Sequence, residues 1–263
     1  MDEPQGPVPV SATIPRIPSK LSDAEAERMD WLAAEDDRRK VRAINEEKWE
    51  AVNNATRRLW RDWGERYKRA TFENFATDGR QDNRSVTVAM LRRYGDDIAR
   101  YVRDGMGVVL TGPPGTGKDH LLASLAKVAV CAGLILKWTS GNRLFRRFRD
   151  DIAADRGESE TVREFTKPDV LIVSDPAWDR QALTRYQREK LGDIVDERAN
   201  NLRPTWVSIN ADNAVQASEL LGSALVDRLR DGALSLACNW GSHRKAVHEL
   251  ADRDQRQPKQ EDE

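Results

Sequence analysis

The chain has 263 residues, of which 39% are hydrophobic and 33% are charged, and its formal net charge is −1. This length permits one well-buried core and an accessory segment, and the near-zero charge excludes a globally basic protein, so that any contact with nucleic acid must come from local patches. No apolar run approaches the length of a membrane span, and we therefore expect a cytoplasmic protein with no membrane contact.

The N-terminal part of the sequence divides into two segments. Residues 1–20 carry five prolines and few residues that can pack, which predicts a disordered lead-in. Residues 21–63 contain neither glycine nor proline, and Ser22 followed by Glu25 matches a capping box. An apolar stripe about 100° wide follows and comprises Val41, Ile44, Val52, Ala55, Leu59 and Trp63. We expect residues 21–69 to form an amphipathic helical segment that binds a partner, because one such helix or helix pair is too thin to build a core.

Four tryptophans in this segment are compatible with two roles. Trp31, Trp49, Trp60 and Trp63 either cover the core of the protein or offer a surface to a partner. Amphipathic helices with tryptophan anchors suit binding in a groove. The sequence favours neither role.

The rest of the chain alternates between strand and helix patterns. A helix is predicted from about residue 85 to residue 103. Strands are predicted near 107–111, 134–138, 169–174, 205–209 and 233–238, with helices between most of them. The continuous apolar run over 170–173 is typical of a strand buried on both faces of a parallel sheet. We therefore predict an α/β fold with a parallel sheet flanked by helices, followed by a disordered tail over 250–263.

Neither the cysteines nor the histidines indicate a metal centre. Cys131 and Cys238 are isolated in apolar surroundings, which predicts two buried, reduced thiols. His120, His243 and His248 lack the spacing of metal ligands. A zinc site is not expected.

A glycine-rich turn with a terminal lysine follows the first apolar strand and precedes a helix. Such a loop is a P-loop, in which backbone N–H groups, the lysine and the helix N-terminus all face one phosphate chain. Asp119 stands where a Ser or Thr usually holds Mg²⁺. The residues predicted to bind the nucleotide are Gly112, Pro113, Pro114, Gly115, Thr116, Gly117, Lys118, Asp119 and His120. The sequence thus predicts binding of ATP or GTP.

Two polar residues end the next buried strands. Asp175 follows the strand over 170–174, at the position of a carboxylate that holds Mg²⁺, usually through water. Asn210 follows the strand over 205–209, where an amide can orient the attacking water. Each residue is also compatible with a purely local role, as a helix cap or a turn residue. Their occurrence at two strand ends favours the functional interpretation, with Asp119 and Asp175 as candidate metal ligands.

A basic segment follows the second predicted strand. Phe145, Phe148 and Ile152 share one helical face, and arginines occupy much of the remainder. This pattern describes either a solvated surface helix or a grip on the backbone of single-stranded DNA. The candidate DNA-binding residues are Arg143, Arg146 and Arg147.

Several stretches together resemble the helicase-loader branch of the AAA+ ATPases, which includes the DnaC and DnaI loaders and the IstB-type transposition helpers. The resemblance covers roughly residues 70–248. The matching stretches are Thr71-Phe72-Glu73-Asn74-Phe75, the loop over 112–121, Asp196-Glu197-Arg198, Arg203-Pro204-Thr205, Val226-Asp227-Arg228-Leu229 and Asn239-Trp240-Gly241-Ser242-His243-Arg244.

The resemblance implies an AAA+ ATP-binding core over 70–249 with an abbreviated lid. Arg228 resembles the arginine finger that is offered to a neighbouring subunit, and Arg244 resembles the sensor II arginine. With Asn210, these two arginines are the candidate catalytic residues. The implied ligands are ATP and Mg²⁺. The implied partners are single-stranded DNA, further copies of the chain in a nucleotide-dependent homo-oligomer, and a replicative helicase or, alternatively, a transposase.

Two departures from the family pattern bear on hydrolysis. Pro176 follows Asp175, where active members usually carry an acid that polarises the attacking water. The carboxylate of Asp119 near triphosphate oxygens costs about 1–4 kcal/mol unless Mg²⁺ bridges the charges. We therefore expect Mg²⁺-dependent ATP binding with slow or absent hydrolysis. Rapid turnover would indicate another base, such as Asp179. The alternatives are a catalytically inactive nucleotide-binding adaptor and a small-molecule kinase, which would leave Asn210 and Arg228 unexplained.

Overall fold

The structure is a computed structural model that describes residues 63–75 and 83–244, together with single residues and short runs between 28 and 61. The chain divides into two units, residues 1–49 and 50–263. The lead-in over 1–20, the tail over 250–263, Trp49, Trp60 and most of the apolar stripe lie outside the described residues.

In the first unit, the described residues are helical. They include Trp31, whose side chain is 59% exposed. Ion pairs one helical turn apart join Glu35 to Arg38 and Arg39, both at 3.9 Å, and Asp36 to Lys40 at 2.7 Å. Exposed pairs of this kind contribute only a few tenths of a kcal/mol each, about 0.3–0.5. The partner-binding role of residues 21–69 stays a prediction.

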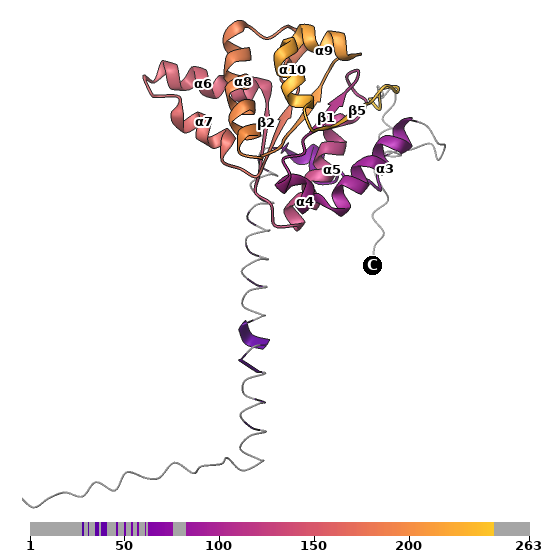
Figure 1. The fold of residues 1–263 in the computed structure, drawn as a ribbon. Helices are drawn as coiled ribbons and strands as arrows, with labels where there is room; N and C mark the ends of the chain where they lie inside the picture. The colour runs from indigo at the N-terminus through magenta and orange to yellow at the C-terminus, as the bar shows by residue number, and fades with distance from the viewer. Residues whose placement is uncertain are drawn as a thin grey trace, which may run out of the picture. The chain divides into compact units, whose positions relative to one another are not determined.

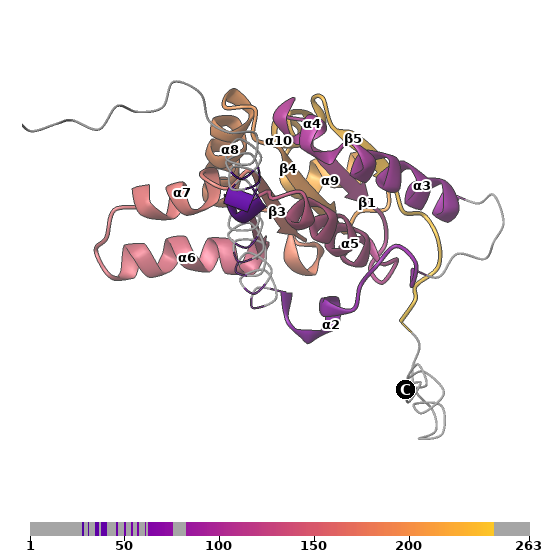
Figure 2. The same ribbon diagram turned by 90° about the horizontal axis from the view of Figure 1, so that it is seen from below.

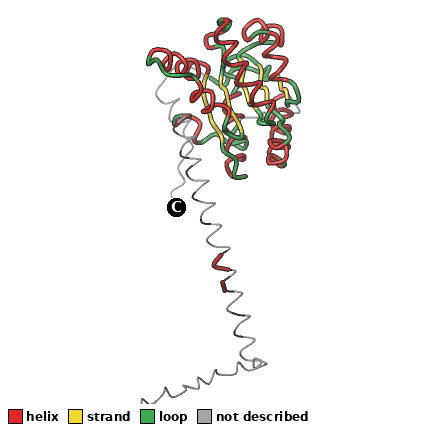
Figure 3. The backbone as a smooth tube through the Cα atoms, turned by 60° about the vertical axis from the view of Figure 1, so that its left-hand side comes forward, coloured by secondary structure: helices red, strands yellow, loops and turns green. Residues whose placement is uncertain are grey.

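The second unit is built on a five-stranded parallel sheet with the order β2-β3-β4-β1-β5 (Figure 1). The strands are β1 (Val108–Thr111), β2 (Leu136–Ser140), β3 (Val170–Ser174), β4 (Thr205–Ile209) and β5 (Leu234–Ala237). In Figure 3 they lie between helices on both sides. The predicted parallel α/β fold is confirmed.

Alternate residues along each strand bury into opposite layers. Val108 and Leu110 pack into one apolar core, whereas Val109 packs into the other. The first core is covered by α3 (Asn83–Asp96), α4 (Ile98–Arg103) and α5 (Lys118–Cys131), of which α3 and α5 lie side by side (Figure 2). The second core is covered by α6 (Gly141–Ala153), α7 (Ser159–Thr166), α8 (Arg185–Asn200), α9 (Ala214–Leu221) and α10 (Ser223–Arg230).

Residues 63–75 pack against the first core. This stretch contains the short helix α2 (Glu65–Lys68). Trp63 is only 6% exposed and meets Trp138 of β2 edge-on, with 5.4 Å between ring centroids. Lys127 of α5 donates to the backbone carbonyls of Lys68 and Ala70, each at 2.6 Å. Of the four tryptophans, Trp63 therefore covers the core.

Three local expectations need correction. The predicted strand over 134–138 is found at Leu136–Ser140, because Gly133 turns the chain at φ 82° and Leu134 still donates to Ala129 at the end of α5. The predicted helix over 85–103 is split at Asp97, whose ψ of 28° is not helical. Cys131 is exposed at the last position of α5, whereas Cys238 is buried as predicted.

Among the residues that the structure describes, none of the helices has both the length and the apolar character needed to cross a membrane.

Candidate functional site

A cleft of about 440 Å³ lies at the carboxyl ends of the strands, and the segments that follow all five strands contribute to it. Parallel α/β sheets bind their ligands at this edge. Of the predicted site residues, the cleft brings together Gly115, Gly117, Lys118, Asp119, His120, Asp175, Asn210 and Arg244. Its other lining residues are Tyr67, Asn74, Phe75, Ser140, Asn142, Ser174, Trp178, Ser208 and His243.

The loop between β1 and α5 has a backbone that only glycine adopts without strain. Gly115 and Gly117 have φ angles of 87° and 89°. A Cβ atom on Gly115 would lie 2.1 Å from the hydroxyl oxygen of Ser242, and one on Gly117 would lie 2.6 Å from the ring of Phe75. The loop is therefore closely covered, and larger residues at either position would displace it.

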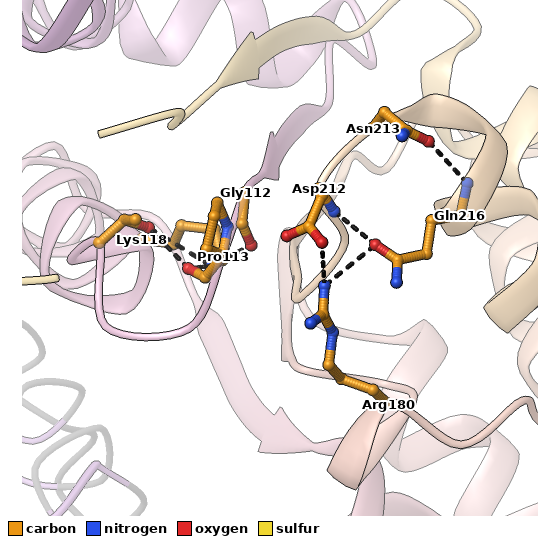
Figure 4. A network of polar contacts seen from close by, with 8 residues as sticks. Gly112, Pro113, Lys118, Arg180, Asp212, Asn213 and Gln216 are labelled. Atoms are coloured by element: carbon orange, nitrogen blue, oxygen red, sulfur yellow. Dashed lines mark hydrogen bonds and ion pairs between the residues drawn. The ribbon is translucent and has the colours of Figure 1, made fainter. Parts of the chain in front are cut away.

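Lys118 is buried at the start of α5, with 5% of its surface exposed. Its Nζ atom donates to the carbonyl oxygens of Gly112 and Pro113, both at 2.8 Å (Figure 4). Burial lowers the pKa of Lys118 below its ordinary value. The ammonium group thus borders the cleft within the glycine loop, where it can donate to phosphate oxygens.

Asp119 is held by hydroxyl groups from three separate elements. Ser174 at the end of β3 donates to its Oδ2 atom at 2.7 Å, and Ser208 of β4 donates to its Oδ1 atom at 2.6 Å. Tyr67 of α2 adds a longer contact of 3.4 Å to Oδ2. The carboxylate is therefore fixed beside the ends of the two strands that carry Asp175 and Asn210.

Asp175 and Asn210 form a direct pair across the ends of β3 and β4. The side-chain amide of Asn210 donates to Oδ2 of Asp175 at 2.7 Å. Burial raises the pKa of Asp175 to about 6. Its Oδ1 atom is buried and accepts no hydrogen bond within the described part of the chain. A buried, unsatisfied carboxylate oxygen is costly, which points to an unmet partner in the cleft.

The cleft fits a triphosphate with Mg²⁺. The unsatisfied oxygen of Asp175 is a hard donor of the kind that Mg²⁺ prefers, directly or through water. Lys118 and the N–H groups of the glycine loop would hold the phosphates, with Asp119 beside them. When bound, the ion would neutralise phosphate charge. Asn210 holds Asp175 in place and lines the same cleft, and its predicted role in orienting a water molecule stays a prediction.

The segment after β5 and Phe75 together cover the glycine loop. Trp240 donates its indole N–H to the carbonyl of Thr116 at 2.8 Å, and the backbone N–H of His243 donates to Gly115 at 2.9 Å. Phe75 lies edge-on to the ring of His243, with centroids 5.2 Å apart. These contacts place Arg244 on the wall of the cleft, and its role as a sensor II arginine stays a prediction.

A second polar network ties the loop after β3 to the loop after β4. Arg180 donates to Asp212 at 2.7 Å and to Gln216 at 3.0 Å, and Gln216 accepts from the backbone of Asp212 (Figure 4). Arg180 and its neighbour Asp179 both have positive φ angles, 54° and 59°. Such conformations persist only where surrounding contacts hold them. The network therefore joins the loop that carries Asp175 to the loop that carries Asn210.

Among the other predicted residues, Gly112, Pro113, Pro114 and Thr116 belong to the glycine loop but do not line the cleft, and four arginines lie elsewhere. Arg228 on α10 forms an ion pair with Asp196 on α8 at 2.6 Å, on the surface of the second layer. Arg143, Arg146 and Arg147 are exposed on α6, and Arg147 pairs with Glu164 at 3.2 Å.

Ile152 was predicted to share one face of α6 with Phe145 and Phe148, which are buried, but Ile152 is 59% exposed. The last turn of this helix instead buries Asp151, which accepts a hydrogen bond from Thr161 of α7. Because the last turn of α6 faces α7, the hydrogen bond between Asp151 and Thr161 stands where an apolar contact of Ile152 was expected.

Sequence reasoning missed the residues that organise the carboxylates. Ser174 and Ser208 interrupt otherwise apolar strands at their carboxyl ends, and this interruption is the sequence signal that marks them. Nothing local marks Tyr67 or Arg180, because their partners lie 52 and 32 residues away.

The raised pKa of Asp175 predicts a pH-dependent penalty on stability. Because its folded pKa of about 6 lies above the unfolded value of 3.8, the protonated side chain is favoured in the folded state. That contribution is complete below about pH 4 and is lost as the pH rises through 6. Asp175→Asn should therefore gain free energy of unfolding relative to wild type, by about 1–3 kcal/mol between pH 4 and pH 7.

Urea unfolding in EDTA at several pH values measures this difference. The control is Asp193→Asn, which removes an exposed carboxylate from α8. Parallel pH curves for wild type and Asp175→Asn would contradict the burial of the Asp175 charge.

Comparison with known proteins identifies the family. The sequence profile of the IstB-like ATP binding proteins matches residues 64–251. The replicative helicase loader DnaC of Escherichia coli strain K12 is 24% identical over 185 residues, which cover 69% of this chain and 71% of the loader. A putative ATP-binding protein in an insertion sequence of Mycobacterium tuberculosis is 30% identical over 198 residues, covering 72% and 73% of the two chains.

Solved structures agree on the fold. The crystal structure of the DnaC helicase loader superimposes with a TM-score of 0.59 at 19% identity, over 66% of this chain and 99% of that one. AMPPCP-bound DnaA from Aquifex aeolicus superimposes with a TM-score of 0.53 at 15% identity, over 64% and 50% of the two chains. The chain therefore belongs to the IstB-like ATP-binding proteins, which are AAA+ proteins related to the DnaC helicase loader.

Proposed function

We propose that this protein is an ATP-dependent accessory factor of DNA replication that delivers a replicative helicase to single-stranded DNA. The observation that carries the proposal is the cleft in which Lys118, Asp119, Asp175 and Asn210 converge on the glycine loop. The similarity to a helicase loader over the same core supports the choice of partner. Residues 21–69 would dock on the helicase in the cytoplasm, and the core would hold the nucleotide.

The residues that follow β3 suit the binding of a nucleotide better than its hydrolysis. Pro176 stands after Asp175, is buried, and offers neither a carboxylate nor an N–H group to an attacking water. The backbone there is tightly packed, since a Cβ on Gly141 would lie 2.3 Å from the carbonyl oxygen of Pro176. Asp179, the other candidate base, is exposed and does not line the cleft. We expect slow hydrolysis and a switch that responds to nucleotide occupancy.

Arg228 fits the role of a finger offered to a second copy of the chain. It lies away from its own cleft, so that it cannot reach a nucleotide bound there. Its exposed ion pair with Asp196 is worth about 1 kcal/mol or less, and a phosphate from a neighbour could displace it. Light scattering should therefore show Mg²⁺-ATP-dependent growth beyond the monomer, and Arg228→Ala should weaken it.

Co-elution with the partner tests the loader function. The full-length protein, tagged at its C-terminus, should retain a hexameric replicative helicase on a column in Mg²⁺-ATP, and retention should fall with Lys118→Met. Omission of ATP provides the matched control. Failure to retain helicase under any nucleotide condition would contradict the loader function.

A second candidate function is that of a transposition helper. It is favoured by the 30% identity to an ATP-binding protein encoded in an insertion sequence. The same column assay separates the two candidates, because a helper would retain the transposase of its element and not the helicase.

Binding of single-stranded DNA tests the basic face of α6. Arg146 and Arg147 are exposed, although Glu164 already pairs with Arg147. If this face contacts the DNA backbone, Arg146→Glu with Arg147→Glu should lower affinity for oligo-dT about tenfold or more and reduce the salt slope by about two. The control is Arg103→Glu, an exposed arginine on the opposite layer. Unchanged affinity and slope would leave α6 a solvated surface helix.

A further inference from the structure

The glycine loop of this protein ends in a carboxylate where P-loops usually carry a hydroxyl. The side chain of Asp119 belongs to the first turn of α5 and lines the cleft next to Lys118. It is therefore a negative charge placed in a site that otherwise suits phosphates. Its surroundings show how the charge is held there.

Two rigid strand ends fix this carboxylate. Ser174 and Ser208 donate to different oxygens of Asp119, at 2.7 and 2.6 Å. Both serines are nearly buried, with 8% and 2% of their surfaces exposed. The two serine hydroxyls thus hold both oxygens of the carboxyl group at the N-terminal end of α5. The carboxyl group of Asp119 is therefore held in one position on the wall of the cleft.

The carboxylate of Asp119 changes the balance between positive and negative side chains in the cleft. Lys118 and Arg244 supply two positive charges, and Asp119 and Asp175 supply two negative ones when ionised. A hydroxyl residue at position 119 would leave one positive charge in excess. The four side chains of the cleft therefore carry no net positive charge that would attract a metal-free triphosphate. A complex of the triphosphate with a divalent cation instead brings a positive charge toward both carboxylates.

We propose that Asp119, positioned by Ser174 and Ser208, makes nucleotide binding conditional on a divalent cation, so that the cleft selects the metal complex of a nucleoside triphosphate over the free anion. The inference depends on the proposed nucleotide binding at this cleft. It concerns a specificity-determining residue that sets which form of the nucleotide is bound.

Equilibrium titration of the full-length protein with ATP, in Mg²⁺ and in EDTA, tests this selection. Asp119→Asn is the main variant, because it keeps the size of the side chain and removes the charge. Its amide nitrogen can donate to the hydroxyl oxygen of one of Ser174 and Ser208, while its amide oxygen accepts from the hydroxyl of the other. Metal-free ATP should bind Asp119→Asn about tenfold more tightly than wild type at 0.1 M salt, while the dissociation constant in Mg²⁺ changes less.

Two further variants serve as controls for this test. Asp119→Thr supplies the more usual hydroxyl and should show the same loss of metal selectivity, so that the test survives if the asparagine variant misfolds. Asp193→Asn removes an exposed carboxylate from α8 and should keep the selectivity of wild type. Thermal unfolding in EDTA confirms that each variant is folded.

The outcomes separate this inference from the proposed function. If wild type binds no ATP even in Mg²⁺, the nucleotide-binding function itself is wrong. If wild type binds Mg²⁺-ATP and both Asp119 variants lose affinity in EDTA by the same factor as wild type, the metal selectivity of Asp119 is wrong and the function stands. A tenfold smaller penalty for removing the metal in both variants would support the inference.

Discussion

Lys118→Met is expected to weaken binding of Mg²⁺-ATP by about 100-fold or more. The ammonium group is buried within the glycine loop and supplies the one positively charged side chain of residues 112–119. Removing one partner of a buried, charge-assisted contact typically costs about 2–5 kcal/mol. Isothermal titration of the full-length protein with ATP in Mg²⁺ measures the loss.

The fold should survive this substitution. Methionine has nearly the same length as lysine, and burial already disfavours the charged form of Lys118, whose pKa is lowered. The substitution removes the hydrogen bonds to the carbonyls of Gly112 and Pro113 and a longer one, at 3.5 Å, to the hydroxyl of Thr116. Lys167→Met, at an exposed lysine after α7, is the matched control and should bind like wild type. Near-wild-type affinity of Lys118→Met would show that the loop does not hold the phosphates.

Arg198→Met is expected to have the largest effect on stability, a loss of about 3–5 kcal/mol in free energy of unfolding. Arg198 is fully buried, and its guanidinium reaches the ends of three segments. It donates to the carbonyls of Phe165, Thr166, Pro168, Asp169 and Pro204 and to the hydroxyl of Thr205. Without it, these buried acceptors lose a shared donor that a methionine cannot replace.

Urea unfolding at neutral pH measures the loss. Arg198→Lys provides a graded comparison, since an ammonium group offers fewer donors than the planar guanidinium and should recover only part of the stability. Arg103→Met, at an exposed arginine on α4, should change stability by less than about 0.5 kcal/mol. A loss below about 1 kcal/mol for Arg198→Met would contradict its role in joining β3 and β4 to α7.

Much of the fold was predictable because its signals are local. The apolar run over 170–173 and the strand over 205–209 show the pattern of strands buried on both faces, and the structure places them at β3 and β4. The start of β2 was predicted two residues too early, because the turn at Gly133 extends the end of α5. The break at Asp97 follows Gly95 by two residues, and the prediction of one helix over 85–103 did not take this glycine as the end of a helix.

A site residue could be predicted from the sequence where its place depends only on the end of its own strand. Asp175 and Asn210 were placed at neighbouring strand ends, and the structure joins them by a hydrogen bond of 2.7 Å. The contacts of Asp119 with Ser174 and Ser208 depend on three elements that meet only in the folded sheet. The buried position of Arg198, read from sequence only as part of a family motif, likewise depends on loops brought together by the tertiary fold.

Hydrogen exchange with mass spectrometry, comparing the full-length protein with and without Mg²⁺-ATP, tests the nucleotide site most directly. Peptides spanning residues 112–120 and 172–177 should gain protection when Mg²⁺-ATP is present, because the loop N–H groups would donate to phosphate and Asp175 would gain a partner for its unsatisfied oxygen. Peptides over α6 and α7 should be unchanged when DNA is absent. No gain of protection over 112–120 at saturating Mg²⁺-ATP would contradict the assignment of this cleft as the nucleotide site.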